Sequence, residues 1–173
     1  MKKSGILKPR LFMLGLSALA IGTAPLQAHE ADCPFCALPV VQDTAEQNNE
    51  VALRYGRKRI EYRCVYCALK EAHTEYSGDL SILAPSEDKT APVVLKRTDG
   101  KWSADPQNAV FAAQKASHKV CQVTYRAFAS RAAFDAYVKK HANVFDKDTK
   151  PVTLSQLLDI TKPKSQTKEG KKQ

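Results

Sequence analysis

The sequence predicts an α+β protein made of two tandem β-β-α-β units that pack together. Three observations support this fold class. Alternating apolar residues flank a short turn near residue 56, a helical apolar period follows at once, and the same order of elements recurs along the chain at an offset of 63 residues. In this repeat, the matched residues are Ile60, Tyr62 and Arg63 with Val123, Tyr125 and Arg126.

The first unit is expected over residues 29–89. Residues 29–50 should form a loop that carries a first cysteine pair. Apolar residues then alternate over 51–55 and 60–62, which predicts a hairpin with one buried face. From residue 65 to about 76 the apolar residues recur at three- or four-residue steps, so we expect a helix. Gly78 ends it, and residues 80–83 predict a short strand.

The second unit is expected over residues 90–160. Asp99-Gly100 predicts a hairpin turn between strands at 93–95 and 101–103. Asp105-Pro106 resembles a helix start that leads into a short Ala-rich helix. A strand at 120–125 and a helix from Ser130 to about residue 142 should follow, then a short strand at 143–145. Thr153 and Gln156 predict a capping box for a last helix that ends near Ile160.

Both ends of the chain should lie outside this fold. Residues 1–28 have a positive start, an apolar run from Leu11 to Gly22 and small residues before Ala28, which is typical of a secretory signal. We therefore expect export, to the periplasm or beyond, and cleavage after Ala28. No second apolar run predicts a transmembrane segment in the mature chain. Residues 161–173 are Lys-rich without aromatic residues and predict a disordered tail.

The net charge of +9 does not indicate a nucleic-acid partner. Residues 1–28 carry +4, and residues 161–173 carry another +4, which leaves +1 for residues 29–160. The predicted folded part is therefore nearly neutral and lacks the basic character of nucleic-acid-binding domains.

Four of the five cysteines form two C-x-x-C pairs, Cys33-Pro34-Phe35-Cys36 and Cys64-Val65-Tyr66-Cys67. Two such turns can close a four-sulfur metal site, so we expect the four sulfurs to converge. Thiolates suit Cu(I) and Zn(II) alike. Structural disulfides and a redox-active pair are the alternatives in an oxidising compartment. The second pair should start a helix, where the helix dipole lowers the pKa of a cysteine.

Three further residues are candidate additional ligands. His118 and Cys121 are close in sequence, although a buried free cysteine and an exposed histidine are the simpler explanation. His29 would become the N-terminal residue after cleavage, and a terminal amine with an imidazole can chelate copper. No nucleophile elbow or phosphate-binding loop is found, so we do not expect an enzyme.

Taken with these features, the chain resembles the NosL family of nitrous-oxide-reductase accessory proteins. The resemblance rests on the N-terminal C-x-x-C, on Tyr62-Arg63-Cys64 at a helix start, on Gly100-Lys101-Trp102 followed by Ala109-Val110-Phe111, and on the run from Tyr125 to Phe134 with His141 beyond it. It implies two β-β-α-β units, export, and Cu(I) binding for delivery to a client copper enzyme. A thiol-disulfide oxidoreductase and a structural-zinc interaction module are the alternative functions.

Overall fold

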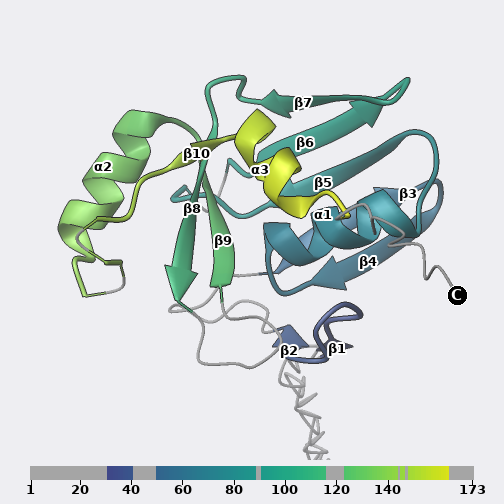
Figure 1. Ribbon diagram of the computed structural model, residues 1–173, viewed down its shortest axis with the longest axis horizontal. Coiled ribbons are helices and arrows are strands. Elements are labelled where there is room, and N and C mark those ends of the chain that lie inside the picture. Colours follow the sequence, from purple (N-terminus) through teal and green to yellow (C-terminus); the bar gives the residue numbers. More distant parts are fainter. Residues whose placement is uncertain are drawn as a thin grey trace, which may run out of the picture.

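The computed structural model describes residues 31–40, 50–88, 91–115, 123–143, 145–146 and 148–163. These residues form a mixed α+β structure of helices and antiparallel sheets, which confirms the predicted fold class (Figure 1). The elements in chain order are β1 (Ala31–Asp32), β2 (Pro39–Val40), β3 (Val51–Tyr55), β4 (Lys58–Tyr62), α1 (Val65–Thr74), β5 (Leu80–Ala84), β6 (Val93–Thr98), β7 (Lys101–Asp105), β8 (Val110–Lys115), β9 (Val123–Phe128), α2 (Arg131–Lys140), β10 (Val152–Thr153) and α3 (Leu154–Thr161).

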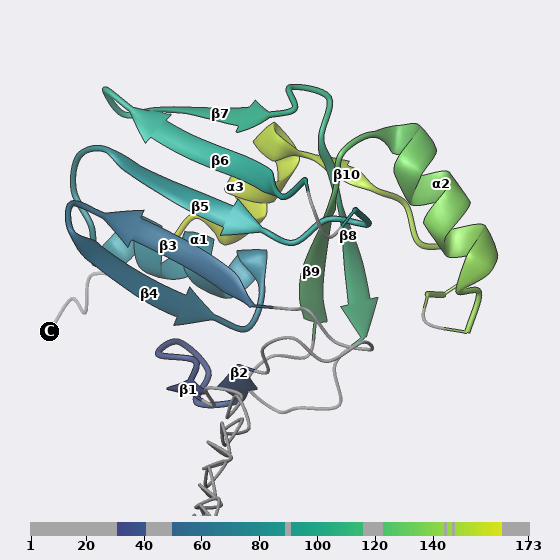
Figure 2. The same cartoon turned by 180° about the vertical axis from the view of Figure 1, so that it is seen from behind.

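The first β-β-α-β unit consists of β3, β4, α1 and β5, as the apolar patterns predicted. Its strands belong to a five-stranded antiparallel sheet with the order β4-β3-β5-β6-β7. The two views show α1 and α3 together on one face of this sheet (Figures 1 and 2). The β6–β7 hairpin turns at Asp99 and Gly100, both with positive φ, as the sequence predicted. This hairpin was expected in the second unit, but it pairs with β5 and extends the first sheet.

The second unit consists of β8, β9, α2 and β10, and its sheet has the order β10-β8-β9. This matches the first unit, in which the third strand also pairs with the first strand to give β5-β3-β4. The last residues of the two second strands, Tyr62 and Phe128, pair with the first residues of β3 and β8 and are fully buried. The two units pack through α1 against β9, and α3, which follows β10, packs against α1.

Two predicted elements in this unit are wrong. The Ala-rich helix after Asp105-Pro106 is instead strand β8, whose pairing on both sides outweighs the helix propensity of alanine. Residues 143 and 145 lie in a turn and a bend, and the third strand is β10 further along the chain. The helix cap at Ser130 and the capping box of Thr153 and Gln156 are both present.

Both ends of the sequence extend beyond the described residues. The predicted signal at 1–28 and residues 164–173 of the predicted tail lie outside them. Thr161, which was assigned to the tail, is the buried last residue of α3. Among the described residues, no helix combines the length and the apolar character that crossing a bilayer requires.

Buried side chains form two clusters. The larger one fills the space between the five-stranded sheet and α1, and it includes Leu53, Leu69, Ile82 and all four cysteines of the C-x-x-C pairs. The smaller one belongs to the second unit and is mainly aromatic, with Phe128, Phe134 and Phe145. The cysteine pairs therefore lie inside the main core, where an unpaired charge is costly.

Candidate metal centre

The first cysteine pair lies in a short ribbon that was expected to be an irregular loop. β1 and β2 pair across the turn, with Ala31 opposite Val40. The Cys33 amide donates to the carbonyl of Leu38 at 2.8 Å, and the Ala37 amide donates to the carbonyl of Cys33 at 2.7 Å. Ala37 has φ +54, which closes the turn tightly. This backbone places both Cys33 and Cys36 with 4 % or less of their surface exposed.

The second pair lies at the start of α1, as predicted. Cys64 is the N-cap residue with extended backbone, and Cys67 is in the first helical turn. Strand β4 ends just before this segment, and its last residue, Tyr62, is buried in the core. Cys64 and Cys67 are buried as well, at 3 % and 0 % exposure.

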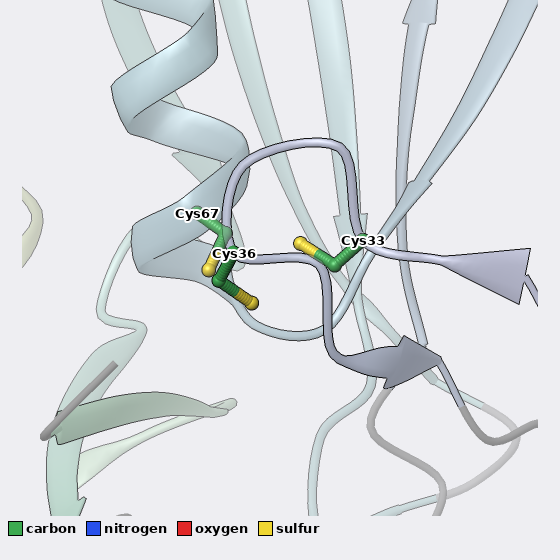
Figure 3. A group of neighbouring side chains, drawn as sticks. All are labelled: Cys33, Cys36 and Cys67. Atoms are coloured by element: carbon green, nitrogen blue, oxygen red, sulfur yellow. The ribbon is translucent and has the colours of Figure 1, made fainter. Parts of the chain in front are cut away.

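The two segments bring their sulfurs together, as the doubled pair predicted. The Sγ atoms of Cys33, Cys36 and Cys67 all lie within 4.8 Å of one another. Figure 3 shows Cys67 leaving α1 beside Cys36, with the Cys33 sulfur directed toward them from the other arm of the turn. The Cys64 Sγ lies 3.5 Å from the Cys67 Sγ but does not belong to this mutually close group. None of these four cysteines is joined in a disulfide.

These distances can be compared with what an ion requires. With metal–sulfur bonds of about 2.3 Å, two sulfurs in a tetrahedral site are separated by about 3.8 Å, and in a trigonal site by about 4.0 Å. Sulfurs that lie within 4.8 Å of one another therefore need to move closer by about 1 Å or less to bind one ion. The cluster is a buried set of soft donors with dimensions that can hold a metal ion.

Hydrogen bonding within the cluster lowers the pKa of two thiols. The pKa of Cys33 falls to about 5, mainly through its hydrogen bond with Cys67 and against the effect of burial, with help from the backbone amide of Arg63. The pKa of Cys64 falls to about 7, again mainly through a hydrogen bond with Cys67. The direction of the shift predicted for the helix start is therefore confirmed for Cys64, but its main cause is the hydrogen bond with Cys67 and not the helix dipole.

The same prediction is wrong for Cys67. Its pKa is raised well above the ordinary range, because hydrogen bonds to Cys33 and Cys64 and burial all favour the neutral thiol. The Cys67 thiol therefore stays protonated, and the sulfurs of Cys33 and Cys64 both interact with it. A metal ion that binds Cys67 as a thiolate must displace this proton.

Aromatic rings line the cluster, a feature that the sequence analysis missed. Phe35 and Tyr66 each occupy the position before the second cysteine of their pair, and their rings meet edge to face at 6.1 Å. Tyr66 also stacks on Tyr125 from β9 at 6.1 Å. Burial and the neighbouring Cys64 raise the pKa of Tyr125. The sequence did contain a signal for this feature, because an aromatic residue stands at the same position in both motifs.

The remaining candidate ligands cannot be placed. His29, His118 and Cys121 all lie outside the described residues. Among the residues that the structure describes, the group that could hold an ion is Cys33, Cys36 and Cys67.

Comparisons with known proteins bear on the fold. No protein-family model matches the chain, and no curated protein matches it in sequence. Among solved structures, the fold is similar to the crystal structure of the mercury-bound form of MerB2, with a TM-score of 0.52 and 15 % sequence identity. The match covers 64 % of this chain and 55 % of that chain, so the chain spans little more than half of that structure's length. At this identity, the likeness concerns the fold alone.

Proposed function

We propose that this protein is an exported accessory protein of the NosL type that binds Cu(I) at its cysteine cluster and delivers it to a client copper enzyme. The observation that carries the proposal is the convergence of two distant C-x-x-C segments into one buried group of sulfurs. Thiolates are soft ligands that suit Cu(I) as well as Zn(II), and the resemblance to the NosL family favours Cu(I). The mercury bound in MerB2, another soft ion, also supports this class of cargo.

The arrangement of the two segments supports a route for capture and release. The ribbon carries Cys33 and Cys36 on a separate two-stranded element, whereas Cys67 is fixed on α1. An ion held between the two can be bound as the ribbon closes on the helix. It can be released by stepwise exchange of thiolates with those of a partner. The role is binding and delivery, not catalysis.

A thiol-disulfide oxidoreductase is the second candidate, and one observation favours it. Cys64 has a pKa of about 7, and its Sγ lies 3.5 Å from that of Cys67 at the start of a helix. However, the attacking thiol of such an enzyme must reach a substrate disulfide, and Cys64 is only 3 % exposed. This burial favours metal binding.

The test is a Cu(I) titration of the reduced mature protein without oxygen, in competition with a chromophoric Cu(I) chelator, followed by thiol counting. We expect one tightly bound ion per chain and protection of the cluster thiols from alkylation. A Cys121→Ser variant serves as the matched control, and it should bind equally well if the described cluster is the site. Reduced protein that binds no Cu(I), or whose cluster thiols stay open to alkylation after Cu(I) is added, would overturn the proposal.

A further inference from the structure

The four cysteines are not equivalent, and the difference concerns Cys64. The sulfurs of Cys33, Cys36 and Cys67 form one mutually close group, whereas Cys64 approaches that group only through Cys67, at 3.5 Å. A tetrahedral four-sulfur site needs six similar sulfur–sulfur distances. Here, three sulfurs lie within 4.8 Å of one another, and a contraction of about 1 Å or less brings them to the separation of a trigonal site.

The second unit explains why Cys64 is placed differently. Ser130 is the N-cap of α2 with φ −159 and ψ 170, and Cys64 is the N-cap of α1 with φ −157 and ψ 167. The same backbone therefore starts both helices, one with a serine and one with a cysteine. Ser130 Oγ accepts the Ala133 amide at 3.1 Å. The Cys64 sulfur makes no regular cap: it interacts with the backbone amides of Cys67 and Tyr66 and lies 3.5 Å from the Cys67 sulfur.

Contacts to the second unit hold the Cys64 side chain as well. Its sulfur accepts a hydrogen bond from the backbone amide of Tyr125 in β9. Tyr125 in turn stacks on Tyr66, the residue between Cys64 and Cys67 that faces this strand. The Cys64 sulfur therefore lies at the interface between α1 and β9.

We propose that Cys33, Cys36 and Cys67 bind the ion as a three-sulfur site, and that Cys64 is a positioning residue that hydrogen-bonds to the Cys67 sulfur without binding the metal. This inference rests on the proposed function and specifies its cargo. Structural zinc sites have four protein ligands, whereas Cu(I) is stable with two or three thiolates, so a buried three-sulfur site fits Cu(I) better than structural Zn(II). Each ligand thiol that binds loses its proton to solvent, and copper stays in the +1 state.

The decisive measurement is the number of sulfurs around copper in the Cu(I)-loaded wild-type protein, obtained by X-ray absorption spectroscopy. We expect three sulfur neighbours. Four equivalent sulfurs would overturn the inference while leaving the proposed function intact. If the wild-type chain binds no Cu(I), the proposed function itself fails, so the two failures are distinguishable.

Matched variants test the role of Cys64 independently. Cys64→Ser places the N-cap residue of the second unit at the same position of the first, so the helix start should be preserved. We expect Cys64→Ser to keep three sulfur neighbours and to bind Cu(I) within about threefold of the wild type, because its hydroxyl can donate to the Cys67 thiolate once the ion has displaced the Cys67 proton. Cys64→Ala cannot donate, and its affinity should fall by about 10–100-fold, as for other groups that orient a ligand.

Cys67→Ser provides the comparison for a ligand, and it should lose one sulfur neighbour and weaken Cu(I) binding by more than 100-fold. The inference is wrong if Cys64→Ser loses a sulfur neighbour or weakens binding as much as Cys67→Ser does. Circular dichroism of each variant checks that the fold is retained.

Discussion

Arg97 fixes the helix that carries the second cysteine pair, and its replacement by methionine should destabilise the protein. The guanidinium donates to the carbonyls of Ala72 at 2.7 Å, Tyr76 at 2.8 Å and Gly78 at 2.7 Å, which are at or just beyond the end of α1. It also lies 5.5 Å from the centre of the Trp102 ring. Only 9 % of Arg97 is exposed.

The magnitude follows from these contacts. A hydrogen bond to a charged group contributes about 1.5–3 kcal/mol, and three of them would give an upper limit near 9 kcal/mol. The true loss is smaller, because Gly78 is exposed and Tyr76 is partly exposed, so water can replace the guanidinium at two of the three carbonyls. Only the carbonyl of Ala72, which is buried, would lose its hydrogen bond from Arg97 without water to replace it. We expect Arg97→Met to lower the free energy of unfolding by about 3–5 kcal/mol.

Urea denaturation of the reduced protein with a chelator present measures this difference. Lys96→Met is the matched control, because it makes the same kind of change at the neighbouring, exposed position of β6. It should shift stability by about 0.5 kcal/mol or less. A loss below about 1 kcal/mol for Arg97→Met, or equal losses for the two variants, would refute the assignment of Arg97 as the cap of α1.

Three other predictions concern the cluster and its counterpart in the second unit. Without metal, the free energy of unfolding should rise with pH between about 5 and 9, because in this range Cys33 is a thiolate in the folded state and a protonated thiol in the unfolded state. This stabilisation is lost as the pH falls through about 5. Urea midpoints across this range measure the effect, and Cys33→Ser should flatten the rise. Mild oxidation of metal-free protein should form the Cys64–Cys67 disulfide first, since these sulfurs are 3.5 Å apart, and peptide mapping that finds a Cys33–Cys36 bond first would contradict it. Ser130→Ala should cost about 1 kcal/mol through loss of the cap, with Cu(I) affinity unchanged; a large drop in affinity would show that the units are coupled.

Sequence reasoning recovered the first unit almost completely, because its elements carry strong local signals. The alternation in β3 and β4 and the helical period of α1 each reflect one buried face. The elements of the second unit carry weaker local signals in the sequence. β8 begins near alanines and its strand character comes from pairing with β9 and β10, which lie at least eight residues away in sequence. The two-residue strand β10 is too short to produce any pattern.

The repeat was found in the sequence but placed three residues out of register. An offset of 63 aligned Tyr62 with Tyr125 and Cys64 with Ala127. The structure aligns the helix caps Cys64 and Ser130 instead, an offset of 66. Residue identity misled here because the aligned tyrosines have different roles: Tyr62 is fully buried at the end of its strand, and Tyr125 lies in mid-strand beside the cysteines.

The convergence of the cysteines was also predictable, because a doubled C-x-x-C has few other uses. The division into three close sulfurs and one separate sulfur was not. It depends on how the ribbon of β1 and β2 docks beside α1, and on the contact between Cys64 and β9. Both are long-range packing effects that leave no trace in the spacing of the motif.

The corrected alignment bears on the structural-zinc alternative. Cys64 and Cys67 correspond to Ser130 and Ala133, and α2 starts with the same backbone as α1 without any sulfur. The turn from strand to helix is therefore stable on capping and packing alone, and the cysteines are not needed to form it. A metal bound there would chiefly order the separate ribbon that carries Cys33 and Cys36. Chelation should consequently expose that ribbon to proteolysis while the two units stay folded, whereas a structural-zinc module would unfold as a whole.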